Sequence, residues 1–179
     1  MWTGTESTIS YNPEFQGFFH LETSFGRIGV VFDLGADKIQ KILPPGFTGS
    51  FLSGHFSSLK PLLEKYLEAW IFNRPLPYIP DDRLDWTGLT PFQISILCYL
   101  KNHSRRGELI SYSELALKAG FPKASRACGR ALANNPFPLV IPCHRVICQN
   151  GEIGGFMGGR QKIILKKKLL RMEGFENWD

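Results

Sequence analysis

The stretch Ile141-Pro142-Cys143-His144-Arg145-Val146 places a cysteine directly beside a histidine in a short apolar run. It follows Asn134-Asn135-Pro136-Phe137-Pro138, whose asparagines and prolines favour a turn. The thiolate is the nucleophilic form of cysteine, and a neighbouring imidazole is one of the few groups that generate it near neutral pH. Taken alone, such a pair more often consists of two packed residues, so the surrounding sequence has to decide between packing and catalysis.

The composition is that of an ordinary globular protein, with 43% hydrophobic and 21% charged residues in 179. This length allows one large domain or two small ones. No apolar run reaches the roughly 20 residues of a membrane span, and the N-terminus has no basic segment followed by an apolar one. We therefore expect an intracellular protein without a membrane partner, cytoplasmic and associated with the nucleoid, or nuclear if the source is eukaryotic.

Charge is distributed unevenly along the chain. Residues 1–87 contain 7 Lys and Arg against 10 Asp and Glu, whereas residues 88–179 contain 14 against 6. A polyanion such as DNA would be attracted to the second part only. A basic surface that merely keeps the protein in solution would give the same counts, so both interpretations stay open.

The cysteines predict no metal site. All four lie in the second part without paired spacing, which is typical of free thiols in a reducing compartment: Cys98, Cys128, Cys143 and Cys148. The spacing of Cys143 and Cys148 without a second pair is a poor zinc signal. We expect Cys98 and Cys148 to be buried thiols, and we expect no metal and no cofactor.

The first part predicts a small sheet with one helix. Aromatic and β-branched residues recur between glycines over 15–34, which is typical of a hairpin or meander. A loop is expected at 46–54. Apolar residues then follow a helical period over 59–71, which predicts an amphipathic helix packed on the strands. Prolines at 75, 77 and 80 indicate an extended linker.

The second part begins with three predicted helices. Thr90 is a good N-cap before Pro91, and Ser111 with Glu114 has the spacing of a capping box. A third helix is expected over 123–133, and the last two helices are predicted to form a helix-turn-helix. Small residues dominate the third helix, and Arg126 and Arg130 lie on one face. The arginines are typical of phosphate contact or insertion between base pairs, but also of a solvated helix face.

Two further stretches complete the pattern, the glycine-rich Gly151–Gly159 and Leu169-Leu170-Arg171-Met172-Glu173-Gly174. Together these sequences, from about Thr90 to Gly174, resemble the O6-alkylguanine-DNA alkyltransferases, which transfer alkyl groups from guanine in DNA to their own cysteine. The resemblance implies an α+β protein of two domains. Residues 1–74 would form a ribonuclease H-like α/β domain, 75–88 a linker, and 89–179 a mainly helical domain with a winged-helix-like helix-turn-helix.

The same resemblance implies roles for individual residues. Cys143 would be the nucleophile, His144 a base acting through water, and Glu173 the acceptor that orients His144. Tyr112 would donate to the leaving guanine, and Asn135 would tie the helix to the reactive loop. From the residues alone, Tyr112 and Asn135 also fit an ordinary aromatic at a helix start and a plain turn asparagine. Arg145 is expected to be paired inside the domain.

The implied DNA contacts lie on the third helix, which enters the minor groove in this family. The alkylated nucleotide is rotated out of the double helix, and Arg126 would take its place. The complete set is Ser125, Arg126, Ala127 and Arg130. The implied substrate pocket comprises Val146, Phe156, Met157 and Gly158. Phe156 stands where tyrosine is common, and Met157 where a small polar residue is frequent. Lys166-Lys167-Lys168 is predicted to be a solvated helix face.

The function predicted from these implications is single-turnover DNA repair by a monomer. The substrate would be double-stranded DNA containing O6-alkylguanine, with O4-alkylthymine left open. Two alternatives remain: a non-catalytic protein that binds alkylated DNA, and a Cys-His hydrolase. The hydrolase leaves the small-residue helix and the basic second part unexplained.

Overall fold

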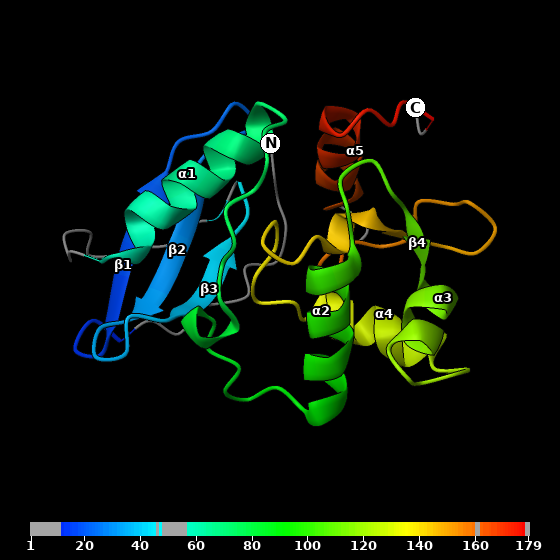
Figure 1. The fold of residues 1–179 in the computed structure, drawn as a ribbon, viewed down its shortest axis with the longest axis horizontal. Helices are drawn as coiled ribbons and strands as arrows, with labels where there is room; N and C mark the ends of the chain where they lie inside the picture. The colour runs from blue at the N-terminus through cyan, green and yellow to red at the C-terminus, as the bar shows by residue number, and fades with distance from the viewer. Residues whose placement is uncertain (1–11, 46, 48–56, 160–161, 178–179) are drawn as a thin grey trace. The chain divides into compact units, whose positions relative to one another are not determined.

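The structure is a computed structural model that describes residues 12–45, 47, 57–159 and 162–177. The chain divides into two compact units between Trp86 and Thr87 (Figure 1). The predicted loop at 46–54 lies outside the described residues except for Phe47. Among the helices that the structure describes, none has the length and apolar character needed to cross a membrane.

The first unit is a three-stranded antiparallel sheet with one long helix. The strands β1 (Gln16–Leu21), β2 (Ile28–Asp33) and β3 (Ile39–Leu43) lie in that order. Helix α1 (Leu59–Ile71) runs across the sheet in Figure 1. The predicted hairpin and helix are confirmed, whereas β3 was not predicted.

Close packing between β1 and β2 requires a glycine at position 17. Gly17 pairs with Phe32 across the strands, and a Cβ atom on Gly17 would lie 2.2 Å from the Phe32 ring. The hairpin also contacts the helix, because the rings of Phe25 and Trp70 meet edge to face with centroids 5.4 Å apart. These contacts place the helix over the sheet, as its apolar face predicts.

The segment 75–88, predicted to be a linker, packs into the first unit over much of its length. Ile79 and Leu84 are buried, and Leu84 forms a bridge with Ile39 of β3. The amide of Asp85 donates to the Ile39 carbonyl at 2.8 Å. The prolines keep the chain extended, as predicted, but the apolar residues between them have side chains to bury. The segment up to Trp86 therefore belongs to the first unit.

The second unit is built on three helices, namely α2 (Pro91–His103), α3 (Tyr112–Lys118) and α4 (Ser125–Ala133). Their facing side chains form a buried apolar core that includes Ile96, Leu97, Leu100, Leu115, Cys128 and Leu132. The three predicted helices are confirmed, with α4 beginning two residues later than expected. This unit also contains a short pair of parallel strands, β4 (Ile110–Ser111) and β5 (Val146–Ile147). Helix α5 (Ile163–Met172) ends it.

The starts of α2 and α3 are capped by the residues that the sequence predicts. Thr90 Oγ1 accepts from the Gln93 amide at 3.3 Å, and the Thr90 amide donates to Gln93 Oε1 at 2.9 Å. Ser111 Oγ accepts from the Glu114 amide at 3.1 Å. The Glu114 carboxylate pairs with Lys118 instead of completing the predicted capping box.

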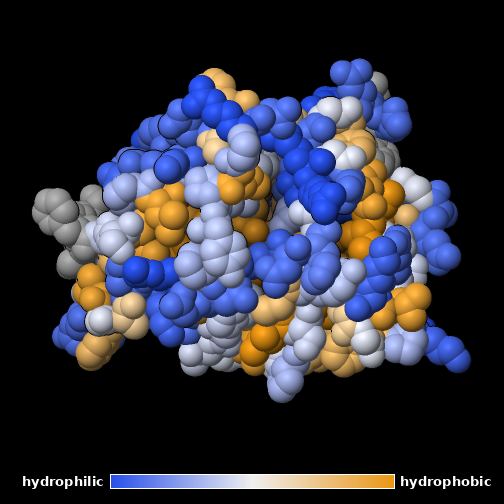
Figure 2. Space-filling model, in the orientation of Figure 1, coloured by the Kyte–Doolittle hydropathy of each residue, from blue (hydrophilic) through white to orange (hydrophobic). Residues whose placement is uncertain are grey.

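Hydrophilic residues cover most of the visible face of each unit, and hydrophobic ones show in smaller areas (Figure 2). The largest exposed apolar side chains lie in different segments, such as Phe15, Tyr78 and Ile164. Scattered exposed apolar residues of this kind are normal for a folded protein.

Replacing Thr90 by alanine is expected to destabilise the second unit by about 1 kcal/mol, because α2 loses a side-chain acceptor for an unpaired backbone amide. Urea unfolding at pH 7 measures the change. Thr90→Ser is the matched control, because serine retains the capping hydroxyl and should stay close to the parent. Equal losses in the two variants would contradict a capping role.

Candidate active site

Cys143 lies in a single turn of 3-10 helix, η2 (Cys143–Arg145), between the buried segment 137–142 and β5. Its side chain is only 4% exposed. The sulfur nevertheless belongs to the wall of a cavity of about 330 Å³. The thiol is thus shielded from bulk water but open to a molecule that enters the cavity.

Asn135 connects the end of α4 to this turn. Its Nδ2 donates to the Ile141 carbonyl at 3.0 Å and to Cys143 Sγ at 3.2 Å, while its Oδ1 accepts from the Phe137 amide at 3.0 Å. The side chain is buried. Asn135 therefore does more than form a turn, because the same amide holds the loop and contacts the sulfur.

The resting state of Cys143 is the thiol rather than the thiolate that the neighbouring imidazole suggested. Burial raises the pKa of Cys143, and the hydrogen bond from Asn135 and the charge of Lys166 offset this only in part. A buried anion without full compensation is costly. A reaction at this sulfur therefore needs a base to remove the proton.

His144, Arg145 and Glu173 form a buried polar network. Glu173 Oε1 lies 3.0 Å from His144 Nε2 and accepts from Arg145 at 2.8 Å, while Oε2 accepts from Arg145 Nε at 2.8 Å. Arg145 also donates to the Ser104 carbonyl at 3.0 Å. The structure thus brings Glu173 to His144 and pairs Arg145 inside the domain, as the sequence predicts.

The network fixes the form of the imidazole. Burial lowers the pKa of His144 despite its hydrogen bond to Glu173, so the ring is neutral at pH 7. A carboxylate only accepts hydrogen bonds, so Nε2 carries the hydrogen and Nδ1 the lone pair that can take a proton. For Glu173, burial raises the pKa, but His144 and Arg145 more than offset it and bring it to about 2.

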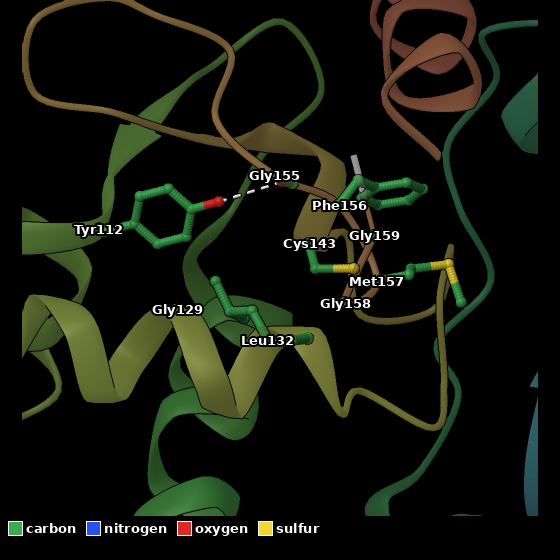
Figure 3. Close-up of a pocket in the computed structure, with 10 residues that line it drawn as sticks. Tyr112, Gly129, Leu132, Cys143, Gly155, Phe156, Met157, Gly158 and Gly159 are labelled. Carbon is green, nitrogen blue, oxygen red and sulfur yellow. Dashed lines mark hydrogen bonds between the residues drawn. The ribbon is translucent and has the colours of Figure 1, made fainter. Parts of the chain in front are cut away.

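The cavity beside Cys143 lies between α4 and the glycine-rich loop that precedes α5 (Figure 3). Tyr112 stands on one side of it, and the hydroxyl donates to the Gly155 carbonyl at 3.2 Å. Its other lining residues are Gly129, Leu132, Ala133, Gly155, Phe156, Met157, Gly158 and Gly159. Phe156, Met157 and Gly158, which the resemblance assigns to the substrate pocket, line this cavity. Val146 does not, because its side chain is fully buried elsewhere.

The β4–β5 pair explains why Tyr112 and Cys143 meet although they are distant in sequence. Ile110 pairs with Val146 and Ser111 with Ile147. Tyr112 follows β4 directly, and Cys143 lies just before β5. Two backbone pairs are therefore enough to bring the start of α3 next to the reactive turn.

Helix α4 connects the cavity to the surface. Gly129 and Ala133 line the cavity, and Arg126 precedes them by three and seven residues, which places it on the same helix face. Arg126 and Arg130 are exposed, while Ser125 and Ala127 are half-buried. The four predicted DNA-contacting residues thus lie on the helix that forms one wall of the cavity.

Lys166 is a residue of this site that the sequence did not predict. The expected solvated lysine face is wrong at this position, because Lys166 is fully buried and donates to three carbonyls. Burial lowers its pKa to about 8, so the ammonium form predominates at pH 7. A signal was present, since Lys166 precedes Leu169, Leu170 and Glu173 by three, four and seven residues on the buried face of α5.

The expectation for two other thiols is also wrong. Cys98 and Cys148 are half-buried rather than buried, whereas Cys128, like Cys143, is buried. Burial raises the pKa of Cys128 to about 12. Cys128 is fully buried among the small residues of α4.

The second unit is therefore a helix-turn-helix domain with a buried, hydrogen-bonded cysteine at the wall of a cavity. Residues 91–175 match the family described as 6-O-methylguanine DNA methyltransferase, DNA binding domain. The match lies within the second unit and shows the likeness of residues 91–175 to this family.

Relatives with similar sequences are methylated-DNA--protein-cysteine methyltransferases. The protein from Cricetulus griseus is 51% identical over 83 residues, which are 46% of this chain and 39% of that protein. The one from Methanothermobacter thermautotrophicus is 47% identical over 91 residues, 51% of this chain and 48% of that protein. The matched segments thus span less than half of these relatives.

Solved structures match over more of the chain. The Mycobacterium tuberculosis OGT in complex with DNA is 27% identical, with a TM-score of 0.68 over 88% of this chain and 92% of that one. The O6-methylguanine-DNA methyltransferase from Pyrococcus kodakaraensis is 21% identical, with a TM-score of 0.62 over 89% and 99%. The second likeness concerns the fold alone.

Acidification should protonate Glu173 and weaken its interactions with His144 and Arg145. The pKa of Glu173 is lowered from 4.5 to about 2, so its stabilisation is complete above pH 4.5 and is lost as pH falls towards 2. The loss is expected to be about 3 kcal/mol. Urea unfolding of the parent and of Glu173→Gln between pH 7 and pH 2 measures it.

Glu173→Gln should be less stable at pH 7, because it leaves Arg145 buried without its anion, and should lack this part of the acid dependence. Glu176→Gln is the control, since that residue is exposed three positions further on, and it should follow the parent. The same acid dependence in Glu173→Gln and the parent would contradict the assignment.

Proposed function

We propose that this protein repairs DNA by transferring the methyl or other alkyl group from O6 of guanine to Sγ of Cys143. Each molecule would react once. The observation that carries the proposal is the position of Cys143, buried yet forming part of the wall of a cavity whose other side holds Tyr112 and a glycine-rich loop. The family to which residues 91–175 belong supports it.

The proposed reaction is a single displacement. The Cys143 proton passes to Nδ1 of His144 through a water molecule, and Sγ forms a bond to the alkyl carbon while the bond from that carbon to O6 breaks. The electron pair goes to the purine, which then takes up a proton. Glu173 and Arg145 support this role of His144, because the neutral ring is oriented with its lone pair at Nδ1.

Tyr112 would assist the departure of the purine. Burial raises the pKa of Tyr112 to about 12, so its hydroxyl keeps its hydrogen at neutral pH and remains a donor. In the structure it donates to the Gly155 carbonyl at the cavity wall. In the proposed reaction it turns from this carbonyl to the guanine, where negative charge develops.

Access of a guanine to this cavity requires that the nucleotide leave the double helix, because O6 is stacked inside it. We assign this step to α4 in the minor groove. Its small residues allow close approach, Arg126 would occupy the vacated position, and Ser125, Ala127 and Arg130 would contact the strand. The proposed partner is double-stranded DNA with O6-alkylguanine, and O4-alkylthymine is a second substrate to test. The protein would act in the cytoplasm or nucleus, where DNA is found.

Cys143→Ser should abolish transfer, because an alcohol is a far weaker nucleophile than a thiolate. The dissociation constant for DNA should stay within about twofold, since the sulfur is buried away from the exposed face of α4. The measurement uses DNA with one O6-[³H]methylguanine, followed by digestion and peptide mapping. Label on the peptide containing Cys143, at one per molecule, is the expected result. Cys98→Ser is the control and should still accept the label.

The same experiment separates the rival functions. Tight binding of the modified DNA without transfer would favour the non-catalytic binding protein. Absence of both, with turnover of an ester or peptide that is lost in Cys143→Ser, would favour the hydrolase. Either outcome would overturn the proposed repair function.

Arg126→Ala should slow transfer from duplex DNA roughly a hundredfold, because the variant no longer offsets the few kcal/mol needed to extrude a nucleotide. Reaction with free O6-methylguanine should change little, since no extrusion is needed. Arg105→Ala removes the same charge at another exposed position of the second unit and should affect both substrates only slightly. Equal losses of the transfer rate on duplex DNA and on the free base in Arg126→Ala would contradict the proposal that Arg126 occupies the position vacated by the nucleotide.

A further inference from the structure

Lys166 occupies a fully buried position in α5, where a charged side chain is costly unless all its donors are satisfied. Its Nζ donates to the Val146 carbonyl at 2.5 Å, to the Ile153 carbonyl at 2.6 Å and to the Gly155 carbonyl at 3.3 Å. An ammonium group has three N–H donors, and all three are used. The side chain is therefore held in one arrangement by backbone groups alone.

These three acceptors belong to two different parts of the active site. Val146 begins β5 directly after the turn that contains Cys143. Ile153 and Gly155 belong to the loop whose residues 155–159 line the cavity. One ammonium group thus joins the segment of the nucleophile to the opposite wall of the cavity.

The Gly155 carbonyl is shared with Tyr112, whose hydroxyl donates to it at 3.2 Å. Lys166 Nζ lies 5.9 Å from the centre of the Tyr112 ring. When Tyr112 turns to a substrate, this carbonyl loses one of its two donors and keeps Lys166. The loop then has a remaining contact that holds it in place while the tyrosine is engaged elsewhere.

We infer that Lys166 is a positioning residue, whose ammonium group holds the loop 153–159 against Val146 so that the cavity keeps its shape beside Cys143 during the reaction. The last part of this inference rests on the proposed alkyl transfer. The first part, the holding of the loop, is independent of it. Its hydrogen bonds go to backbone carbonyls, and its charge acts on Cys143 besides; the exchange of the loop amides is the measurement that isolates the holding role.

The test compares Lys166→Met, which keeps the length and removes the donors, with Lys168→Met. Lys168 lies on the exposed side of the same helix, so the control removes the same charge without touching the loop. Hydrogen exchange of the amides in 153–159 is the first measurement. Exchange about tenfold faster in Lys166→Met only is expected, because the loop opens locally more often.

The second measurement is transfer from DNA with O6-methylguanine in a single turnover, at a temperature well below unfolding of each variant. Lys166→Met should lower the rate constant about 10- to 100-fold, as misplacement of a reacting group does, and leave the dissociation constant for DNA within about twofold. Unchanged exchange in 153–159, or an equal weakening of DNA binding and transfer, would overturn the inference.

A double-mutant cycle with Tyr112→Phe tests the connection through Gly155. If Lys166 acts on the position of Tyr112, the loss in the double variant is smaller than the product of the two single losses. Independent, multiplicative losses would overturn this connection. If Lys166→Met does not fold, Lys166→Gln serves instead, because it keeps two N–H donors, and it should give an intermediate effect in both measurements.

Failure of the inference and failure of the proposed function have different signatures. Normal transfer by the parent and by Lys166→Met would overturn the inference and leave the repair function intact. No transfer by the parent would overturn the repair function, and the exchange of 153–159 would still decide whether Lys166 holds the loop.

Discussion

The carboxylate of Glu173 is the constraint on which the geometry of this site depends. It is buried, and it accepts hydrogen bonds from both Arg145 and His144. Without it, Arg145 would be a buried charge without its anion, and His144 would lose the acceptor that fixes its ring. Glu173 sits just past the end of α5, where the helix dipole disfavours a negative charge. The two donors offset that cost, and in doing so they attach the end of the helix to the reactive turn.

Helix α5 makes a second attachment to the same turn. Lys166 and Glu173 are seven residues apart, two helical turns along one face, and they bind successive parts of one short segment. Glu173 holds His144 and Arg145, while Lys166 holds the Val146 carbonyl. A segment that is hydrogen-bonded at both ends to buried charged groups has little freedom to rearrange. This rigidity is what a displacement reaction requires, since the sulfur has to lie in line with the bond that breaks.

Much of this arrangement could be predicted from the sequence, and the part that could not has a common cause. The Thr90 cap and the three helices follow from local spacing, and the pairing of His144 with Glu173 was implied by the family resemblance. The burial of Lys166, the packing of Leu84 on Ile39 and the withdrawal of Val146 from the cavity depend on contacts between distant segments. In a run of three lysines the charge suggests solvent, and only the phase of the helix shows that one of them faces the core. The raised pKa of Cys143 likewise comes from burial, which the neighbouring histidine does not reveal.

A thiol that rests in its neutral form is consistent with a protein that reacts once. A thiolate exposed to solvent would be open to oxidation and to unselective alkylation, and either would consume the molecule. Burial keeps Cys143 protonated, and in the proposed transfer a base would remove the proton only once a substrate fills the cavity. The product thioether carries no charge, so the same burial that disfavours the thiolate does not disfavour the product. The environment of Cys143 thus opposes premature reaction, and burial is no obstacle to the uncharged alkylated product.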